Sequence, residues 1–119
     1  MDMREQRFGI EIEMTGVTRQ RAAQVLSEYF GRPTNFDGGY YGEYSVLDSQ
    51  SRRWKVMSDG SITTERKEGR RVVSADNSYS VEMVSPICRY EDIETIQEVV
   101  RKLRKSGMRV NNSCGIHIH

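Results

Sequence analysis

The sequence has few of the residues that mark specialised small proteins. Its 119 residues include only two cysteines, two prolines and a single tryptophan. Cys88 and Cys114 are too few for the disulfide framework or zinc ribbon of a cysteine-rich domain. No run approaches the roughly 20 apolar residues that a membrane-spanning helix needs, and the charged N-terminal residues lack the apolar centre of a signal peptide. We therefore expect a cytoplasmic protein with reduced thiols.

The sequence also lacks an excess of positive or of negative charge. The chain has 18 Lys and Arg residues against 17 Asp and Glu residues, for a formal net charge of +1. Proteins that bind nucleic acids or membrane surfaces through general electrostatic attraction need a marked basic excess, so we expect neither partner. The length suits one domain with a core that needs no disulfide or structural metal.

The periodicity of apolar residues predicts an α+β fold. Residues 7–15 alternate between apolar and polar side chains, as in a half-buried strand, and residues 19–30 and 91–106 have the spacing of amphipathic helices. Thr18 is a candidate N-cap and Gly31 a helix stop. The other expected elements are a loop at 34–39, a hairpin formed by 40–47 and 53–57, a charged solvated loop or hairpin end at 65–71, and strands at 79–85, at 108–110 and from Gly115 onward.

Acidic residues occupy the polar face of the first predicted strand. Glu11 and Glu13 are two residues apart, so their carboxylates project from the same face, with Cα atoms roughly 7 Å apart. Such a pair suits hard Mg²⁺ or Mn²⁺, which prefers oxygen ligands together with substrate phosphates. Taken alone, the pair is more typical of an exposed strand face.

Other candidate site residues lie far along the chain. His117 and His119, the only histidines, share one face of the last predicted strand and could serve one metal-nucleotide site. Glu82 is the only charged residue of its predicted strand. In isolation Glu82 is typical of a surface charge, and Asp59 of the first residue of a turn.

Four segments together resemble a known family. They are Phe8-Gly9-Ile10-Glu11-Ile12-Glu13, Trp54-Lys55-Val56-Met57-Ser58-Asp59-Gly60-Ser61, Val81-Glu82-Met83-Val84-Ser85-Pro86-Ile87 and Asn111 through Cys114-Gly115-Ile116-His117-Ile118-His119. In this order, and over nearly the whole chain, they resemble the amidoligase family of carboxylate-amine ligases, which are related to glutamine synthetase and glutamate-cysteine ligase.

The resemblance implies a fold and a set of site residues. The fold would be α+β, an antiparallel sheet with two helices packed on one face, corresponding to one glutamine-synthetase-like β-α-β-β-α half. Glu11, Glu13, Glu82 and His117 would be catalytic residues and ligands of the divalent metals, Mg²⁺ or Mn²⁺, that hold ATP. His119 would lie close to the phosphates, whereas Asp59 matches a family position to which no role is assigned.

The implied reaction is formation of an amide or isopeptide bond through an acyl phosphate, from small-molecule or peptide carboxylate and amine substrates. We expect residues 1–119 to form a single domain, the N-terminal fragment of a longer amidoligase catalytic domain that supplies the metal- and ATP-binding half. An unpaired edge at the last strand would favour a homo-oligomer.

Two other functions stay open on the sequence. The first is a non-catalytic α+β protein-interaction module that uses the acidic face or the basic residues between Arg66 and Arg71 to bind a partner. The second is a hydrolase in which His117 and His119 hold a metal.

Overall fold

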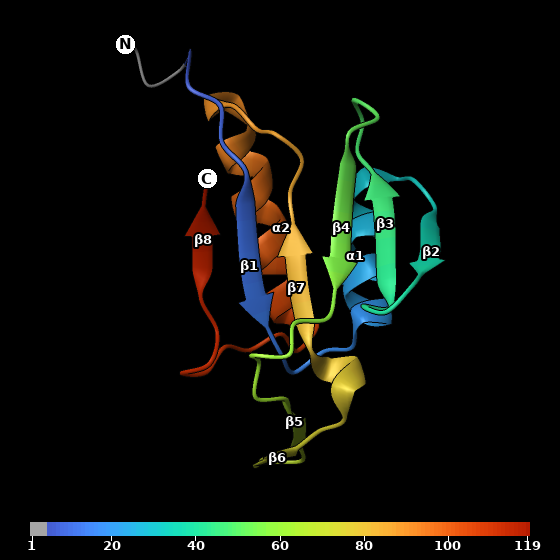
Figure 1. The fold of residues 1–119 in the computed structure, drawn as a ribbon, viewed down its shortest axis with the longest axis vertical. Coiled ribbons are helices and arrows are strands. Elements are labelled where there is room, and N and C mark those ends of the chain that lie inside the picture. Colours follow the sequence, from blue (N-terminus) through green and yellow to red (C-terminus); the bar gives the residue numbers. More distant parts are fainter. Residues whose placement is uncertain (1–4) are drawn as a thin grey trace.

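The computed structural model describes residues 5–119, which form a six-stranded antiparallel sheet with two helices on one face (Figure 1). Chain order is β1 (Ile10–Met14), α1 (Arg19–Phe30), β2 (Thr34–Gly38), β3 (Glu43–Leu47), β4 (Arg53–Met57), β5 (Glu65–Glu68), β6 (Arg71–Ser74), the 3-10 turn η2 (Asn77–Tyr79), β7 (Val81–Val84), the 3-10 turn η3 (Tyr90–Asp92), α2 (Ile93–Lys105) and β8 (Ile116–Ile118). The predicted α+β class is therefore confirmed.

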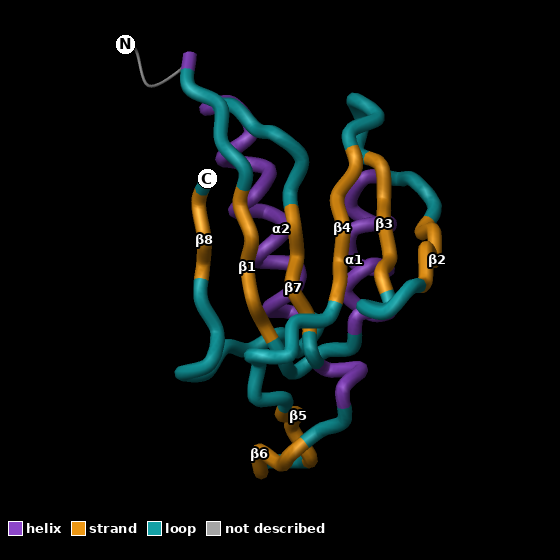
Figure 2. The backbone as a smooth tube through the Cα atoms, viewed as in Figure 1, coloured by secondary structure: helices purple, strands orange, loops and turns teal. Residues whose placement is uncertain are grey.

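The strand order in the main sheet is β2-β3-β4-β7-β1-β8. β5 and β6 pair only with each other and form a hairpin that extends from one end of the main sheet (Figure 2). The charged segment 65–71, predicted as a solvated loop or hairpin end, is thus part of a hairpin. It contains all of β5 and the first residue of β6. None of the helices in residues 5–119 is long and apolar enough to cross a bilayer.

Helix α1 has the bounds that the sequence predicts. The Thr18 hydroxyl accepts a hydrogen bond from the backbone N–H of Arg21, at 3.1 Å, which satisfies one of the free donors of the first turn. Gly31 ends the helix in the left-handed conformation, with φ of 67°, and its N–H donates to the carbonyl of Ser27. Helix α2 begins at Ile93, two residues after its predicted start, because η3 precedes it.

The core lies between the helices and the inner face of the sheet. Apolar side chains that alternate along the strands meet the apolar stripes of α1 and α2. The largest fully buried apolar side chains are Met14, Leu26, Trp54, Met83 and Leu103.

The strand predicted at 40–47 begins only at Glu43, and the strand predicted at 79–85 is β7, because η2 includes Tyr79. Two other predicted segments differ in kind. The predicted loop at 34–39 is strand β2, which pairs with β3 and places Phe36 against Tyr44, with ring centroids 4.9 Å apart. Residues 34–38 have the composition of a turn, which is why the sequence predicts a loop. An edge segment of this composition becomes a strand when a neighbouring strand, here β3, pairs with it. The predicted strand at 108–110 is only a single bridge between Arg109 and Thr15, and a turn at Asn111 ends it.

A buried ionic network ties the β3–β4 turn to the start of α2. Asp48 accepts hydrogen bonds from the indole of Trp54 and from the Arg52 Nε, both at 3.0 Å. Arg52 also forms a bidentate pair with Asp92, with both N–O distances 2.9 Å. The two aspartate side chains are 3% and 9% exposed, so this one guanidinium is the shared ion-pair partner of two buried carboxylates.

Candidate functional site

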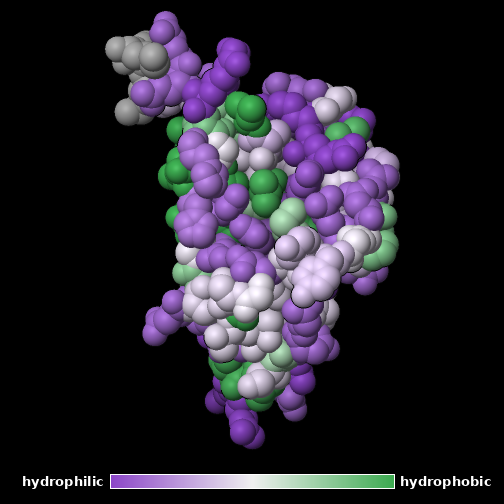
Figure 3. Space-filling model, in the orientation of Figure 1, coloured by the Kyte–Doolittle hydropathy of each residue, from purple (hydrophilic) through white to green (hydrophobic). Residues whose placement is uncertain are grey.

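The acidic residues of β1 project from the open face of the sheet, opposite the helices. Ile12 and Met14 are buried beneath the helices, and alternation along the strand therefore turns Glu11 and Glu13 to the other face. Figure 3 looks onto this open face and shows hydrophilic side chains over β8 and β1. Glu13 is nevertheless 6% exposed, because neighbouring strands and loops surround its carboxylate.

Strand pairing brings the other candidate residues beside them. Glu13 lies opposite Glu82 on β7, and Glu11 lies opposite His117 on β8. His119 Nε2 is 3.2 Å from Glu11 Oε2, and His117 Nδ1 is 3.7 Å from Glu11 Oε1. All five residues named from the sequence thus share one face, although they come from positions as far apart as 11 and 119.

Asp59 joins this group from the loop that follows β4. Its carboxylate accepts hydrogen bonds from the Ser61 backbone N–H, at 2.9 Å, and from the Ser61 hydroxyl, at 2.8 Å. The same Ser61 oxygen is 3.4 Å from Glu13 Oε2. Ser61 therefore lies between the Asp59 and Glu13 carboxylates. The sequence left Asp59 without a role, and the structure places it at the acidic cluster, which we define as Glu11, Glu13, Asp59 and Glu82.

The chain from Asn111 to Gly115 positions the last strand against Glu13. Asn111 Nδ2 donates to the Thr63 carbonyl at 2.9 Å, and Ser113 Oγ accepts from the Thr63 N–H at 2.8 Å. The Gly115 N–H then donates to Glu13 Oε1 at 2.7 Å. A Cβ on Gly115 would lie 3.3 Å from that oxygen, so a glycine allows this close approach.

Mutual repulsion and burial make one carboxyl of the acidic cluster unusually basic. Burial, together with the negative charges of Glu11 and Asp59, raises the pKa of Glu82 to about 7. Burial, followed by a hydrogen bond to Asp59, also raises the pKa of Glu13. Hydrogen bonds from the Ser61 backbone, from Glu13 and from the Ser61 hydroxyl lower the pKa of Asp59. A cation bound at the cluster would therefore compete with a proton for the Glu82 carboxylate.

The donor set matches a hard divalent cation in its chemistry. Carboxylate oxygens are the preferred protein ligands of Mg²⁺ and Mn²⁺, and an imidazole suits Mn²⁺ as well. Within residues 5–119, no three acidic, histidine or cysteine side chains already stand together as a ready-made metal-binding group. The donors line one face and would have to converge on an ion by side-chain rotation.

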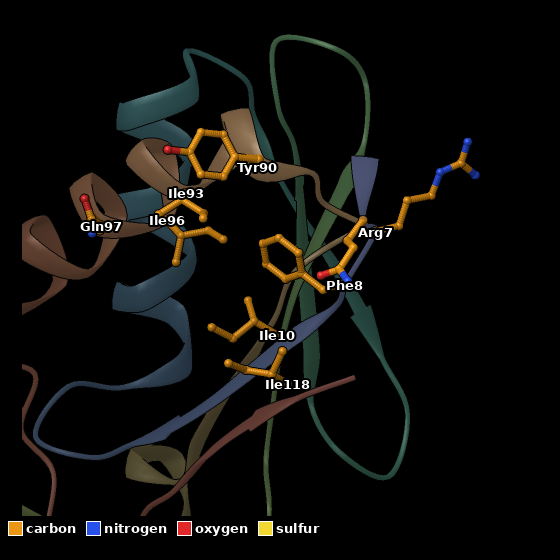
Figure 4. Close-up of a pocket in the computed structure, with 9 residues that line it drawn as sticks. Arg7, Phe8, Ile10, Tyr90, Ile93, Ile96, Gln97 and Ile118 are labelled. Carbon is orange, nitrogen blue, oxygen red and sulfur yellow. The ribbon is translucent and has the colours of Figure 1, made fainter. Parts of the chain in front are cut away.

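An apolar groove of about 410 Å³ lies on the other side of the sheet. Phe8, Ile10 and Ile118 point toward Ile93 and Ile96 of α2 across this groove (Figure 4). These side chains carry no acid, base or metal ligand, which separates the groove from the chemistry of the open face.

Sequence reasoning missed two participants, Ser61 and Gly115. Ser61 follows Asp59-Gly60, whose only evident signal is a turn. Gly115 contributes its backbone N–H. Almost any residue has this group, so the residue type does not reveal the contact, except that the close approach requires a small residue.

Comparison with known families gives one match. The family described as "Putative amidoligase enzyme" matches residues 4–119, essentially the whole chain. Searches of curated proteins and of solved structures gave no match. The family match spans the acidic cluster, both histidines and the loops that join them, and on this match the chain belongs to the amidoligase family.

Proposed function

We propose that this chain provides the metal- and nucleotide-binding half of an ATP-dependent carboxylate-amine ligase. One observation carries the proposal: an amidoligase-family chain gathers four carboxylates and two imidazoles on one sheet face, with the pKa of Glu82 raised to about 7. A cluster that repels itself in this way is stabilised by bound cations.

Glu11, Glu13, Glu82 and His117 would hold Mg²⁺ or Mn²⁺, with His119 beside the phosphates of ATP. Glu11 sits between β7 and β8 and is next to both histidines, so it would connect the carboxylates to the imidazoles. The hydrogen bond from Gly115 fixes Oε1 of Glu13, whereas Oε2 has only the long 3.4 Å contact with the Ser61 hydroxyl, which a cation would replace. When bound, the cation would neutralise phosphate oxygens during transfer.

The proposed reaction has two steps. An oxygen of the substrate carboxylate attacks the γ-phosphorus of ATP, and the bond from that phosphorus to ADP breaks, which gives an acyl phosphate. The amine nitrogen of the second substrate then attacks the acyl carbon, phosphate leaves, and the amine loses a proton to solvent. The chain's own residues bind and orient the reactants, so no protein nucleophile is needed.

Titration with Mn²⁺, followed by EPR, tests this proposal. We expect the 119-residue protein to bind Mn²⁺, and ADP to tighten that binding because its phosphates complete the ligand set. The double variant Glu11→Gln, Glu13→Gln should bind Mn²⁺ on the order of tenfold or more weakly, since it removes two anionic donors.

A matched control removes the same charge elsewhere. Glu94 and Glu98 are carboxylates of α2, on the opposite side of the sheet. The Glu94→Gln, Glu98→Gln variant should bind Mn²⁺ as the wild type does. Equal Mn²⁺ affinity in the wild type and in the folded Glu11→Gln, Glu13→Gln variant would contradict the proposed site.

A further inference from the structure

Lys55 lies on the same open face as the acidic cluster. On β4, Trp54 and Val56 are fully buried against the helices, so alternation turns Lys55 to the other face. Antiparallel pairing places Lys55 opposite Val84 of β7, and Val84 opposite Glu11 of β1. One cross-sheet row therefore runs from His117 through Glu11 and Val84 to Lys55.

The spacing of this row sets the reach of the Lys55 ammonium. Lys55 and Glu11 are separated by two strand spacings, which is roughly 10 Å between their Cα atoms. β4, β7, β1 and β8 lie side by side in this order (Figure 1). Glu82 is one strand away on β7, opposite Met57. An anion held at Glu11 and Glu82 through a cation would thus lie within reach of the flexible lysine side chain.

Lys55 is half-buried, and within residues 5–119 no hydrogen bond or ion pair accounts for its charge. Among residues 5–119 it takes part in none of the ion pairs, which use arginines and histidines instead. Val84 lies between Lys55 and Glu11, and its apolar side chain cannot form a hydrogen bond with either charge. The open face is consequently divided into a carboxylate-rich part over β1 and β7 and a cationic part over β4.

We propose that Lys55 binds the reacting oxyanion of the ligase site, a proposal that rests on the function proposed above. Its ammonium would contact phosphate or carboxylate oxygens on the side of the anion that faces away from the cation. A strongly hydrated point charge on a flexible stem suits this purpose, because it can follow a group as it is transferred. The oxyanion could belong to the phosphate tail of ATP or to the acyl phosphate formed from the substrate carboxylate.

Calorimetric titration of Lys55→Ala tests the assignment, with Mn²⁺ alone, Mn²⁺ with ATP and Mn²⁺ with acetyl phosphate as probes. We expect affinity for Mn²⁺ alone to be unchanged or higher, because a nearby positive charge is removed. Affinity for at least one of the two anions should fall about five- to tenfold, as for loss of one charge-assisted contact. Lys55→Arg should restore part of the loss.

The two anions identify the source of the oxyanion. A loss confined to ATP would assign Lys55 to the nucleotide, whereas a loss confined to acetyl phosphate would assign it to the acyl phosphate. Lys102→Ala is the matched control, because Lys102 is an exposed lysine of α2 on the far side of the sheet. Unchanged affinity for both anions in Lys55→Ala, or an equal loss in Lys102→Ala, would overturn the proposal.

The wild type and the Glu11→Gln, Glu13→Gln variant separate this result from failure of the proposed function. Mn²⁺ binding that depends on Glu11 and Glu13, combined with no effect of Lys55→Ala, would remove Lys55 alone from the site. A wild type that binds neither Mn²⁺ nor either anion would overturn both proposals.

Discussion

We expect Arg52→Ala to lower the free energy of unfolding by about 3–5 kcal/mol at neutral pH, as for the removal of one partner from a buried ionic network. Arg52 contacts Asp48 and Asp92 together, and these aspartates are almost completely buried. Without the guanidinium, both carboxylates would remain charged in the protein interior with part of their hydrogen bonding lost. Urea denaturation, followed by far-UV circular dichroism and by the fluorescence of Trp54, measures the change.

At acidic pH, Arg52→Ala should cause a smaller loss in the free energy of unfolding. In the wild type, the hydrogen bond from Arg52 lowers the pKa of Asp92. Burial raises the pKa of Asp48, but hydrogen bonds from Trp54 and from backbone N–H groups outweigh it and hold that pKa below its usual value. A carboxyl with a lowered folded-state pKa adds stability above its unfolded pKa, and that stability is lost as the pH falls.

The difference between wild type and variant should therefore decrease below about pH 4, where both aspartates begin to bind protons. Arg53→Ala is the control, since Arg53 is the exposed neighbour of Arg52 on the open face, and it should cost less than about 1 kcal/mol. A similar loss in both variants would argue against the network as the source.

Glu82→Gln should stabilise the metal-free protein at pH 8 by about 2 kcal/mol and have little effect at pH 4, after allowance for partial exposure of Glu82. The folded-state pKa of Glu82 is about 7, against 4.5 for an unperturbed glutamate. Below both values the carboxyl is protonated in the folded and unfolded states, so it costs nothing. As the pH rises toward 7, only the unfolded state ionises, and stability falls. Glutamine has nearly the same shape and does not ionise.

Urea denaturation of the wild type and of Glu82→Gln, in EDTA at both pH values, measures this difference. Glu94→Gln on α2 is the comparison, and it should not show the same dependence on pH. A gain of equal size at pH 4 and pH 8 would show that charge repulsion at Glu82 is not its cause. The same substitution should weaken Mn²⁺ binding, because the variant lacks one of the proposed donors.

Local patterns were enough to predict the helices and the faces of the central strands. The bounds of α1 follow from Thr18, Gly31 and the apolar spacing between them, all within a few turns of chain. Alternation along β1 correctly separated Ile12 and Met14 from Glu11 and Glu13. Periodicity carries this information because each side chain's face is set by its own strand or helix.

Features that depend on distant partners were not predictable in this way. β2 looks like a loop until β3 supplies its hydrogen bonds. Asp48 and Asp92 are 44 positions apart, and nothing in either local pattern indicates that Arg52 joins them. Only the family resemblance predicted that Glu82 and His117 converge on the acidic residues of β1. The periodicity of apolar residues does not determine the order of strands in a sheet. The position of Asp59 beside Glu13 depends on the conformation of the loop after β4, which the sequence does not reveal.

The short strand β8 gives the open face a property of its own. β8 has three residues, and among the strands of residues 5–119 its one partner is β1. His117 lies on β8 and His119 directly after it. Closing this pairing joins segments about one hundred positions apart, which makes it slow to form. All three residues of β8 are exposed, so the pairing is also easy to open locally. Amide hydrogen exchange at His119, bonded to Gly9, can therefore occur while Met14 and Trp54 stay protected. The core can therefore stay folded while the histidine-bearing edge opens, and a ligand that contacts the histidines would stabilise this edge as well as the whole fold.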